Sequence, residues 1–347
     1  MLVRDGSFID GKWQPSSGDA SAVVVNPFTE EPFGRATVAT AADVDKAVRS
    51  AQAAFERGEW RNASLEERIS VMEGMRDRIA GRTDELGGLN TSSMGMPFSA
   101  ARLLGGSIEL IDMYIDMARR LKFEYLRRDT TGDALIERRP IGVVAAIVPW
   151  NVPVRSEIKK IIPALLSGCS IVLKPAPETP FGAAALAEIG TEAGLPSGVL
   201  NVVLGDGSTG DHIVRHPLVR KVAFTGSTAT GSKIWSAATD SFKRLQLELG
   251  GKSAAVVLDD ADLEQARPWL NVGIYALSGQ ACTATTRVLA PRSRYDEVVE
   301  VMAEEARKHT MGDPFDPATS LGPLVAERQR KRVLGYIEIG ETKAAKW

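Results

Sequence analysis

One cysteine and one glutamate, 34 positions apart, have the side chains that covalent carbonyl chemistry requires. Cys282 ends a run of mostly small residues that begins at Gly279, and Glu248 lies in the segment 247–252. A thiol becomes a nucleophile when it ionises, and a carboxylate that is ionised at neutral pH can accept a proton from water. The pair predicts a thioester that forms on Cys282 and is hydrolysed by water that Glu248 activates.

Composition and charge exclude two classes of partner. The chain has 347 residues, of which 44% are hydrophobic and 25% charged, which is typical of a globular protein of about two domains. Its net charge of -2 gives no electrostatic attraction for nucleic acid or for an anionic membrane surface. We therefore expect a small-molecule ligand, with no nucleic-acid or membrane partner.

The compartment is predicted from the two cysteines and the N-terminus. The longest apolar run, 142–150, is about half the length of a membrane span, so it predicts a buried strand. The first residues resemble neither a secretory signal nor a transit peptide. Cys169 and Cys282 are isolated, which favours a reducing cytoplasm, and Cys169 is expected to be a small buried side chain. The three histidines form no recognisable metal set, so we expect no metal.

The first 140 residues predict packing helices and a hairpin. Apolar residues recur at helical spacing over 41–60, and Ser64 with Glu67 forms a capping box that starts a second helix. Between Phe123 and Arg139 the pattern changes to alternation around a polar turn, which predicts two antiparallel strands that project from the main body. An isolated hairpin is marginally stable in water, so we expect it to pair with another surface.

From Gly142 onward, short apolar runs alternate with helical patterns. The runs cover 143–148, 170–173, 200–204 and 222–225. Such alternation predicts βαβ units and a parallel sheet covered by helices on both faces. Ligands of these sheets bind beyond the carboxyl ends of the strands, so the residues after each run are the candidates for a site.

Glycine, lysine and hydroxyl side chains follow these four runs. The segments are 149–151, 174–178, 205–210 and 226–231. The third matches a GxGxxG pattern between a strand and a helix, where helix N–H groups could hold a pyrophosphate. Alone it is equally explained by a glycine-rich turn, since no acidic residue follows about 20 positions later. Several such strand ends together predict a dinucleotide site.

Five motifs, in this order, resemble those of the aldehyde dehydrogenase superfamily: Pro149-Trp150-Asn151, Lys174-Pro175-Ala176, Phe224 to Thr228 with Gly231, Glu248 to Lys252, and Gly279 to Cys282. The similarity extends from Phe8 to about Ile337. It implies an α/β fold with a Rossmann-like parallel-sheet cofactor domain, a projecting β-hairpin and an incomplete α/β catalytic domain. The implied boundaries are 1–121 and 143–252 for the NAD(P)-binding domain, 122–142 for the oligomerisation hairpin, and 253–347 for the truncated catalytic domain.

The resemblance also implies a role for each residue. Cys282 would attack an aldehyde, while the side-chain amide of Asn151 and the backbone N–H of Cys282 hold the oxyanion; oxidation by the cofactor would give a thioester, and Glu248 would activate the water that releases a carboxylic acid. The implied cofactor-binding residues are Pro149, Trp150, Lys174, Ala176, Glu178, Gly207, Phe224, Gly226, Ser227, Thr228, Gly231 and Leu249. Pro177 stands where many members have an acidic residue, and Glu178 is displaced by one position. NAD is expected, and NADP remains open.

The end of the chain leaves two functions open. After a helical pattern over 324–337, the sequence closes with polar and basic residues up to Trp347. The resemblance implies further catalytic sheet, a Glu-x-Phe-Gly-Pro-type segment and a terminal strand that pairs with a neighbouring subunit, which this sequence lacks. The family forms homo-oligomers, but the missing strand leaves the oligomeric state open. The chain is either a cytoplasmic NAD(P)-dependent aldehyde dehydrogenase or a truncated, catalytically silent fragment that retains at most dinucleotide binding.

Overall fold

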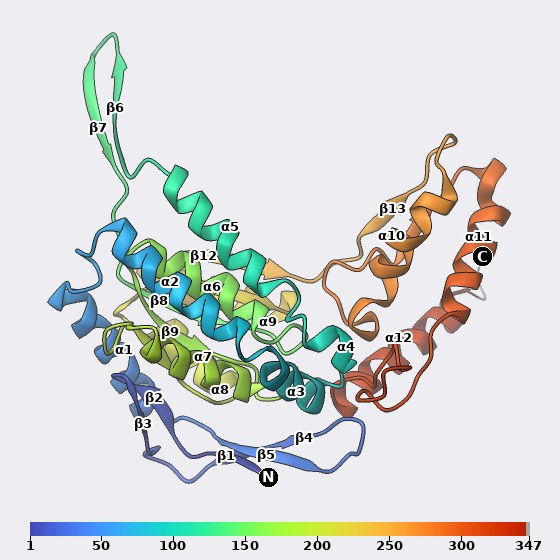
Figure 1. Ribbon diagram of the computed structural model, residues 1–347, viewed down its shortest axis with the longest axis horizontal. Helices are drawn as coiled ribbons and strands as arrows, with labels where there is room; N and C mark the ends of the chain where they lie inside the picture. Colours follow the sequence, from blue (N-terminus) through green and yellow to red (C-terminus); the bar gives the residue numbers. More distant parts are fainter. Residues whose placement is uncertain (345–347) are drawn as a thin grey trace.

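A seven-stranded sheet forms the centre of the fold, which a computed structural model describes for residues 1–344 (Figure 1). Its strands are β2 (Ser7–Ile9), β3 (Lys12–Gln14), β8 (Val143–Ile147), β9 (Ser170–Lys174), β10 (Leu200–Val202), β11 (Val219–Gly226) and β12 (Arg244–Leu249), in the spatial order β12-β11-β8-β9-β10-β2-β3. The five from β12 to β10 are parallel, and β2 and β3 add an antiparallel edge. The parallel sheet predicted from the alternation after Gly142 is confirmed.

Helices cover both faces of this sheet, as the sequence predicted. One face carries α1 (Ala41–Arg57), α8 (Gly207–Arg215) and α9 (Thr228–Ala238). The other carries α2 (Leu65–Ala80), α5 (Ser107–Arg120), α6 (Arg155–Leu166) and α7 (Pro180–Glu192), with α3 (Thr83–Met94) and the short α4 (Phe98–Ala101) beyond them. Residues 1–344 contain no helix that is both long and apolar enough to cross a membrane.

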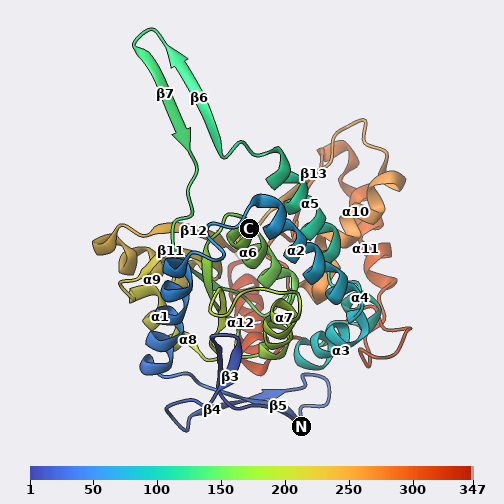
Figure 2. The ribbon, with the colours of Figure 1, turned by 60° about the vertical axis from the view of Figure 1, so that its left-hand side comes forward.

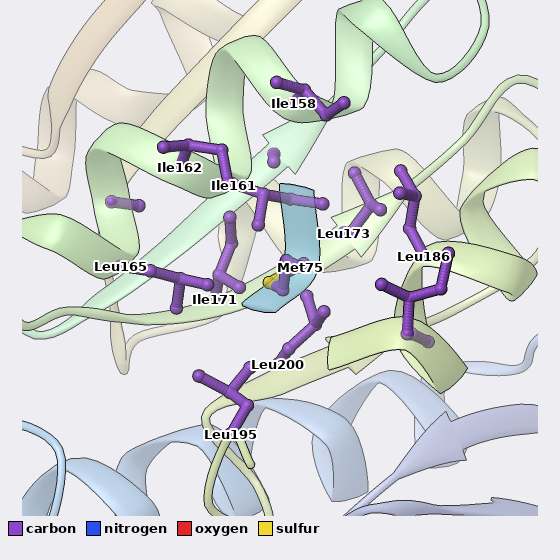
Figure 3. Packing of buried hydrophobic residues seen from close by; sticks show 14 of the residues in the cluster. Met75, Ile158, Ile161, Ile162, Leu165, Ile171, Leu173, Leu186, Leu195 and Leu200 are labelled. Atoms are coloured by element: carbon purple, nitrogen blue, oxygen red, sulfur yellow. The ribbon is translucent and has the colours of Figure 1, made fainter. Parts of the chain in front are cut away.

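The two apolar clusters explain why the central strands are continuous hydrophobic runs. Every residue of β8 and β9 is buried. Because side chains alternate along a strand, Val144 and Ala146 enter the cluster under α6, while Val143 and Ala145 enter the one under α1. Figure 3 shows the α6 side, where Ile161 of the helix and Ile171 of β9 lie in one packed layer with Met75 of α2.

Capping residues fix where the first two helices begin and end. Thr40 and Asp43 form a capping box at the start of α1, and Ser64 and Glu67 form the predicted one at the start of α2. The helix predicted over 41–60 ends earlier, at Arg57, because Gly58 adopts a left-handed conformation with φ 86°. Before these helices, β1 (Leu2–Arg4), β4 (Ser21–Val25) and β5 (Pro32–Thr37) form a separate three-stranded sheet.

The predicted hairpin between Phe123 and Arg139 is confirmed. Within residues 1–344 its strands, β6 (Glu124–Asp129) and β7 (Gly132–Glu137), pair only with each other, and they project far from the body of the molecule, as both views show (Figures 1 and 2). Its assignment to oligomerisation stays a prediction.

The residues after β12 form a lobe beside the sheet (Figure 1). It contains the parallel pair β13 (Ala254–Val256) and β14 (Arg287–Leu289), the helices α10 (Leu263–Tyr275), α11 (Tyr295–Arg307) and α12 (Glu327–Ala344), and 3-10 turns η2 (Ala276–Gly279) and η3 (Arg292–Arg294); another 3-10 turn, η1 (Thr239–Ser241), lies between α9 and β12. The helix predicted over 324–337 begins at Glu327 and extends to Ala344, whereas Trp347 lies outside the described residues.

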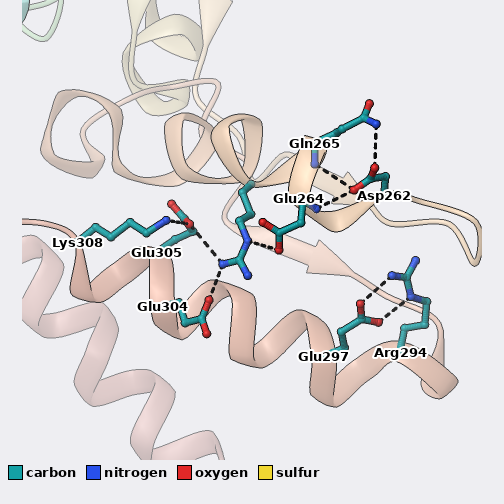
Figure 4. A network of polar contacts seen from close by, with 9 residues as sticks. Asp262, Glu264, Gln265, Arg294, Glu297, Glu304, Glu305 and Lys308 are labelled. Carbon is teal, nitrogen blue, oxygen red and sulfur yellow. Dashed lines mark hydrogen bonds and ion pairs between the residues drawn. The ribbon is translucent and has the colours of Figure 1, made fainter.

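Ion pairs join α10 to α11 in this lobe (Figure 4). The guanidinium of Arg267 pairs with Glu264 on its own helix at 2.8 Å and with Glu304 of α11 at 2.6 Å. Arg294 pairs with Glu297 at 2.9 Å. Beneath this polar surface the apolar contact is a small cluster that includes Val257 and Val301. The lobe therefore has much less buried apolar surface than the main sheet.

The α6 face should carry most of the stability. Met75 of α2 is fully buried, whereas Met117 of α5 is 52% exposed. We expect Met75→Ala to lower the free energy of unfolding by about 2–5 kcal/mol, because it removes buried surface and leaves a cavity. Met117→Ala, the matched control, should change it by less than about 0.5 kcal/mol. Urea unfolding measures both, and equal effects would contradict this assignment of the core.

Candidate functional site

A hydrogen bond joins the end of β8 to the loop that carries Cys282. The amide Nδ2 of Asn151 donates to the backbone carbonyl of Gln280 at 2.8 Å, across 129 positions of sequence. An amide nitrogen carries two hydrogens, so one remains for a ligand. The structure thus brings two of the predicted catalytic segments, which are distant in sequence, into direct contact.

The loop before Cys282 has an uncommon backbone conformation. Leu277, Ser278 and Gly279 lie one after another in the left-handed region, with φ of 58°, 54° and 74°. This conformation costs a residue with a side chain roughly 1–2 kcal/mol. Such a conformation persists only where the surroundings hold it.

Segment 322–325 supplies that support. The hydroxyl of Ser278 accepts a hydrogen bond from the N–H of Gly322, and the side-chain oxygen of Gln280 accepts one from the N–H of Val325, both at 3.0 Å. Leu277 and Val325 also share a small apolar cluster with Trp150. Sequence reasoning missed these supports, since nothing in the local pattern connects residues more than 40 positions apart.

The two cysteines differ in accessibility, and Cys169 is buried as predicted. Cys282 is exposed, whereas Cys169 is 3% exposed beside β9. In the described part of the chain, the backbone N–H of Cys282 donates no hydrogen bond. Both the thiol and this N–H can therefore meet a ligand that enters beside Asn151.

Glu248 lies at the carboxyl end of β12, opposite Thr225 of β11. Its side chain is exposed and, among residues 1–344, no hydrogen bond or ion pair joins it to Cys282. Its charge acts on two neighbours. Burial lowers the pKa of Lys160 to about 8, and the Glu248 carboxylate partly offsets this. Burial also raises the pKa of Tyr114, and Glu248 adds to that rise.

Lys174 connects two strand ends. Its ammonium donates to the carbonyl of Pro175 at 2.7 Å and to that of Gly205, after β10, at 2.9 Å. Burial lowers the pKa of this amine to about 8. These two hydrogen bonds use two of the three ammonium hydrogens and hold the two strand ends together. Ala176, two residues after Lys174, is also buried.

The N-termini of α8 and α9 lie beyond the carboxyl ends of the parallel strands β10 and β11. Asp206 caps α8 by accepting from the N–H of Ser208, and Ser227 caps α9 by accepting from that of Thr230. Free N–H groups at helix N-termini bind anions. A Cβ added to Gly207 would meet no atom within 4 Å, so there is open space at the start of α8.

The remaining predicted cofactor residues contribute in different ways. A Cβ on Gly231 would lie 2.6 Å from Cδ2 of Leu249, so this glycine permits close packing of α9 on β12. Phe224 is buried in the apolar cluster under α1. Gly226, Pro149 and Trp150 are half-buried, and Thr228 is exposed at the start of α9.

Glu178 makes a contact that the sequence did not predict. One carboxylate oxygen pairs with the guanidinium of Arg328, at the start of α12. The other, Oε2, is buried and has no partner within the described residues. A buried, unpaired carboxylate oxygen favours a donor such as a ribose hydroxyl. Together with the open space at Gly207 and the N-termini of α8 and α9, it fits a dinucleotide.

Sequence comparison identifies a family and several relatives that this chain is similar to. The model of the aldehyde dehydrogenase family matches residues 13–347. A geranial dehydrogenase from Castellaniella defragrans is 39% identical over 340 residues, which is 97% of this chain and 71% of that protein. A putative aldehyde dehydrogenase, DhaS, from Bacillus subtilis is 40% identical over 342 residues, 98% of this chain and 69% of that one.

Solved structures agree with this similarity. Mycobacterium tuberculosis aldehyde dehydrogenase complexed with NAD+ has a TM-score of 0.95 and 41% identity, with 99% of this chain and 71% of that one covered. An aldehyde dehydrogenase C mutant from Pseudomonas syringae, complexed with NAD+ and octanal, has a TM-score of 0.92 and 36% identity, with 98% and 70% covered. The α/β fold expected from the motifs is confirmed.

The difference in accessibility predicts how the thiols react. We expect limiting iodoacetamide to label Cys282 about a hundredfold faster than Cys169, because a buried thiol reacts only after local opening. Intact-protein mass spectrometry followed by peptide mapping measures both rates. Cys282→Ser is the control, and it should leave only the slow reaction. Equal rates at the two cysteines would contradict the placement of Cys282 on an exposed loop.

Proposed function

The chain belongs to the aldehyde dehydrogenase family, and we propose that it oxidises an aldehyde to a carboxylic acid with NAD. The observation that carries this proposal is the bond from Asn151 to Gln280, which holds an amide donor beside an exposed thiol. NAD is supported by the NAD+ complexes among the similar structures and by the fit of residues 205–210 and 226–231 to a dinucleotide.

Cys282 acts first in the proposed reaction. Its thiolate attacks the aldehyde carbon, a C–S bond forms, and the electrons of the carbonyl double bond move to its oxygen. The free hydrogen of the Asn151 amide and the N–H of Cys282 then donate to this oxyanion. A neutral amide stabilises the oxyanion without pairing with the thiolate, and each such donor contributes about 3 kcal/mol.

The segments 205–210 and 226–231, which we call the cofactor cradle, would hold NAD as the oxidant. When bound, NAD supplies the two-electron acceptor that converts the cysteine adduct into a thioester. Ser227, Thr228 and the start of α9 would bind the pyrophosphate, and Gly207 leaves room for it at α8. The free Oε2 of Glu178 would accept a ribose hydroxyl and would repel a 2′-phosphate, which favours NAD over NADP.

Glu248 completes the proposed cycle. Its exposed carboxylate removes a proton from water, the resulting hydroxide attacks the thioester carbon, and the C–S bond breaks to release the acid and the Cys282 thiolate. Its position supports this role, because Glu248 lies near the carboxyl end of β12 and Asn151 follows the carboxyl end of the parallel strand β8. A base that activates water favours hydrolysis over transfer of the acyl group to coenzyme A.

We also propose that the hairpin of residues 122–142 contacts another subunit. Leu126 and Leu135 face each other across its two strands, and both side chains are exposed. A hairpin that pairs only with itself is marginally stable in water. Residues 1–121 and 143–252 would then form the cofactor domain, and the residues from 253 onward would belong to the catalytic domain.

Loss of the base should separate formation of the thioester from its hydrolysis. We expect Glu248→Gln to lower steady-state NADH production by about 10²–10⁴-fold, the usual contribution of a general base, while the thioester accumulates on Cys282. Absorbance of NADH measures the rate, and intact-protein mass spectrometry detects the acyl group. The exposed Glu338→Gln on α12 is the matched control and should leave both unchanged.

Two results would contradict this proposal. Turnover that survives Cys282→Ser would show that the thiol is not the nucleophile. An unmodified protein that binds NAD, measured by calorimetry, but neither forms NADH nor acquires an acyl group from any aldehyde supplied would favour the alternative, a chain that retains only dinucleotide binding.

A further inference from the structure

A glutamate side chain lies fully buried in the first turn of α6. Glu157 is 0% exposed. The next residues on this side of the helix, Ile158 and Ile161, are also fully buried and belong to the apolar cluster that α6 forms with the sheet (Figure 3). Among residues 1–344, neither carboxyl oxygen of Glu157 has a hydrogen-bond partner. Because no part of this residue reaches the surface, a group outside the described chain can contact it only if the fold opens.

Burial of this kind keeps a carboxyl group protonated. A carboxylate that leaves water for an apolar interior loses its hydration, so the neutral acid is favoured. Burial accordingly raises the pKa of Glu157 from its ordinary value of 4.5 to about 8, and the backbone N–H groups of Glu157 and Val154 only partly oppose this rise. The helix dipole also favours negative charge in a first turn, but the cost of burial is larger here.

Within the described residues, no charged side chain compensates Glu157, whose pKa responds only to burial and to the two N–H groups. Helix α6 packs against α2, α5, β8 and β9, and β8 has no titratable residue. The buried Arg68 of α2 and Lys174 of β9 donate to backbone carbonyls. On α6 itself and on α5, the charge of the proposed general base acts on Lys160 and on half-buried Tyr114. An ionised Glu157 would therefore be a buried charge without a counter-ion.

The residue that precedes α6 has a strained backbone. Val154 has φ 68° and ψ -56°, a γ-turn geometry that is rare, above all for a β-branched residue. Such a conformation persists only where the surroundings hold it. Packing holds this one, since Val154 is fully buried and its Cγ2 lies 3.2 Å from where a Cβ on Gly182 of α7 would be. Three residues earlier, Asn151 donates to the carbonyl of Gln280. A short strained segment thus connects this amide to the helix that contains Glu157.

We propose that Glu157 is a pH switch: its neutral acid packs at the start of α6, and loss of its proton to solvent opens this helix start and frees Asn151 from its fixed position. A carboxylate requires water or a donor, and among the described residues its interior surroundings supply neither. The strained segment at Val154 is the part of the chain most easily opened, because opening releases the strain and exposes the carboxylate to water. The inference does not rest on the proposed oxidation, since its readouts are unfolding and hydrogen exchange.

The pH dependence of unfolding tests whether the proton is held. Since the pKa of Glu157 in the folded chain lies above its ordinary value, the stability that the proton confers is complete below about pH 4.5 and is lost as the pH rises through about 8. Glu157→Gln stays neutral at every pH. The ratio of its folding equilibrium constant to that of the unmodified protein should therefore rise by about a hundredfold or more between about pH 5 and pH 9. Urea unfolding at each pH measures both constants.

Hydrogen exchange tests whether loss of the proton opens the helix start. In the unmodified protein, amides of residues 150–158 should exchange about tenfold faster at about pH 9 than at pH 6, after correction for the intrinsic effect of pH, because local opening exposes them. Amides of β8 should not change. Glu157→Gln should show no such increase in segment 150–158. If this variant does not fold, as judged by circular dichroism, exchange in the unmodified protein still decides the question.

Glu109→Gln is the matched control. Glu109 is the third residue of α5, as Glu157 is of α6, but its side chain is exposed. Its folding constant should keep a fixed ratio to that of the unmodified protein at every pH. A fixed ratio for Glu157→Gln would show that the buried carboxyl is not held protonated, and unchanged corrected exchange in segment 150–158 would show that the proton does not control the helix start. Either result, or a control that changes as much as Glu157→Gln, would overturn the proposal.

Discussion

The proposed site depends on a parallel sheet whose central strands are buried on both faces. β8 and β9 cannot shift by one residue without moving apolar side chains out of one cluster and into the other, so their register is fixed. That register sets where each strand ends. Lys174 ends β9, and Asn151 and the caps of α8 and α9 follow strand ends, so packing in the interior of the sheet determines their positions.

The same burial has opposite consequences for two lysines. Lys174 and Lys160 both have a pKa lowered to about 8 by burial. Lys174 recovers much of that cost through two carbonyl partners and thereby ties β9 to the loop after β10. Lys160 has no such partner among the described residues, and it lies in a pocket of like charge. Lys174 is therefore a structural element that joins two strand ends.

The loop of residues 277–282, which carries Cys282, is held by hydrogen bonds from both the lobe and the end of β8. Its left-handed backbone at Leu277 and Ser278 is held by hydrogen bonds from segment 322–325, and its carbonyl at Gln280 is held by Asn151. The exposed thiol of Cys282 is therefore positioned by contacts from both parts of the chain. The lobe's own apolar cluster is small, so these polar contacts matter more for the geometry of the loop than for overall stability.

The sequence by itself determined the parallel sheet, the capping box of Ser64 and Glu67, the hairpin, and the motifs that identify the family, because periodicity, caps and local motifs are properties of neighbouring residues. It placed the end of the first helix three residues late, since the left-handed turn at Gly58 stops the helix. Only the tertiary structure decided that Asn151 contacts Gln280 and that Arg328 pairs with Glu178. These features depend on the distance between residues far apart in the chain, and that distance is set by packing of the whole sheet.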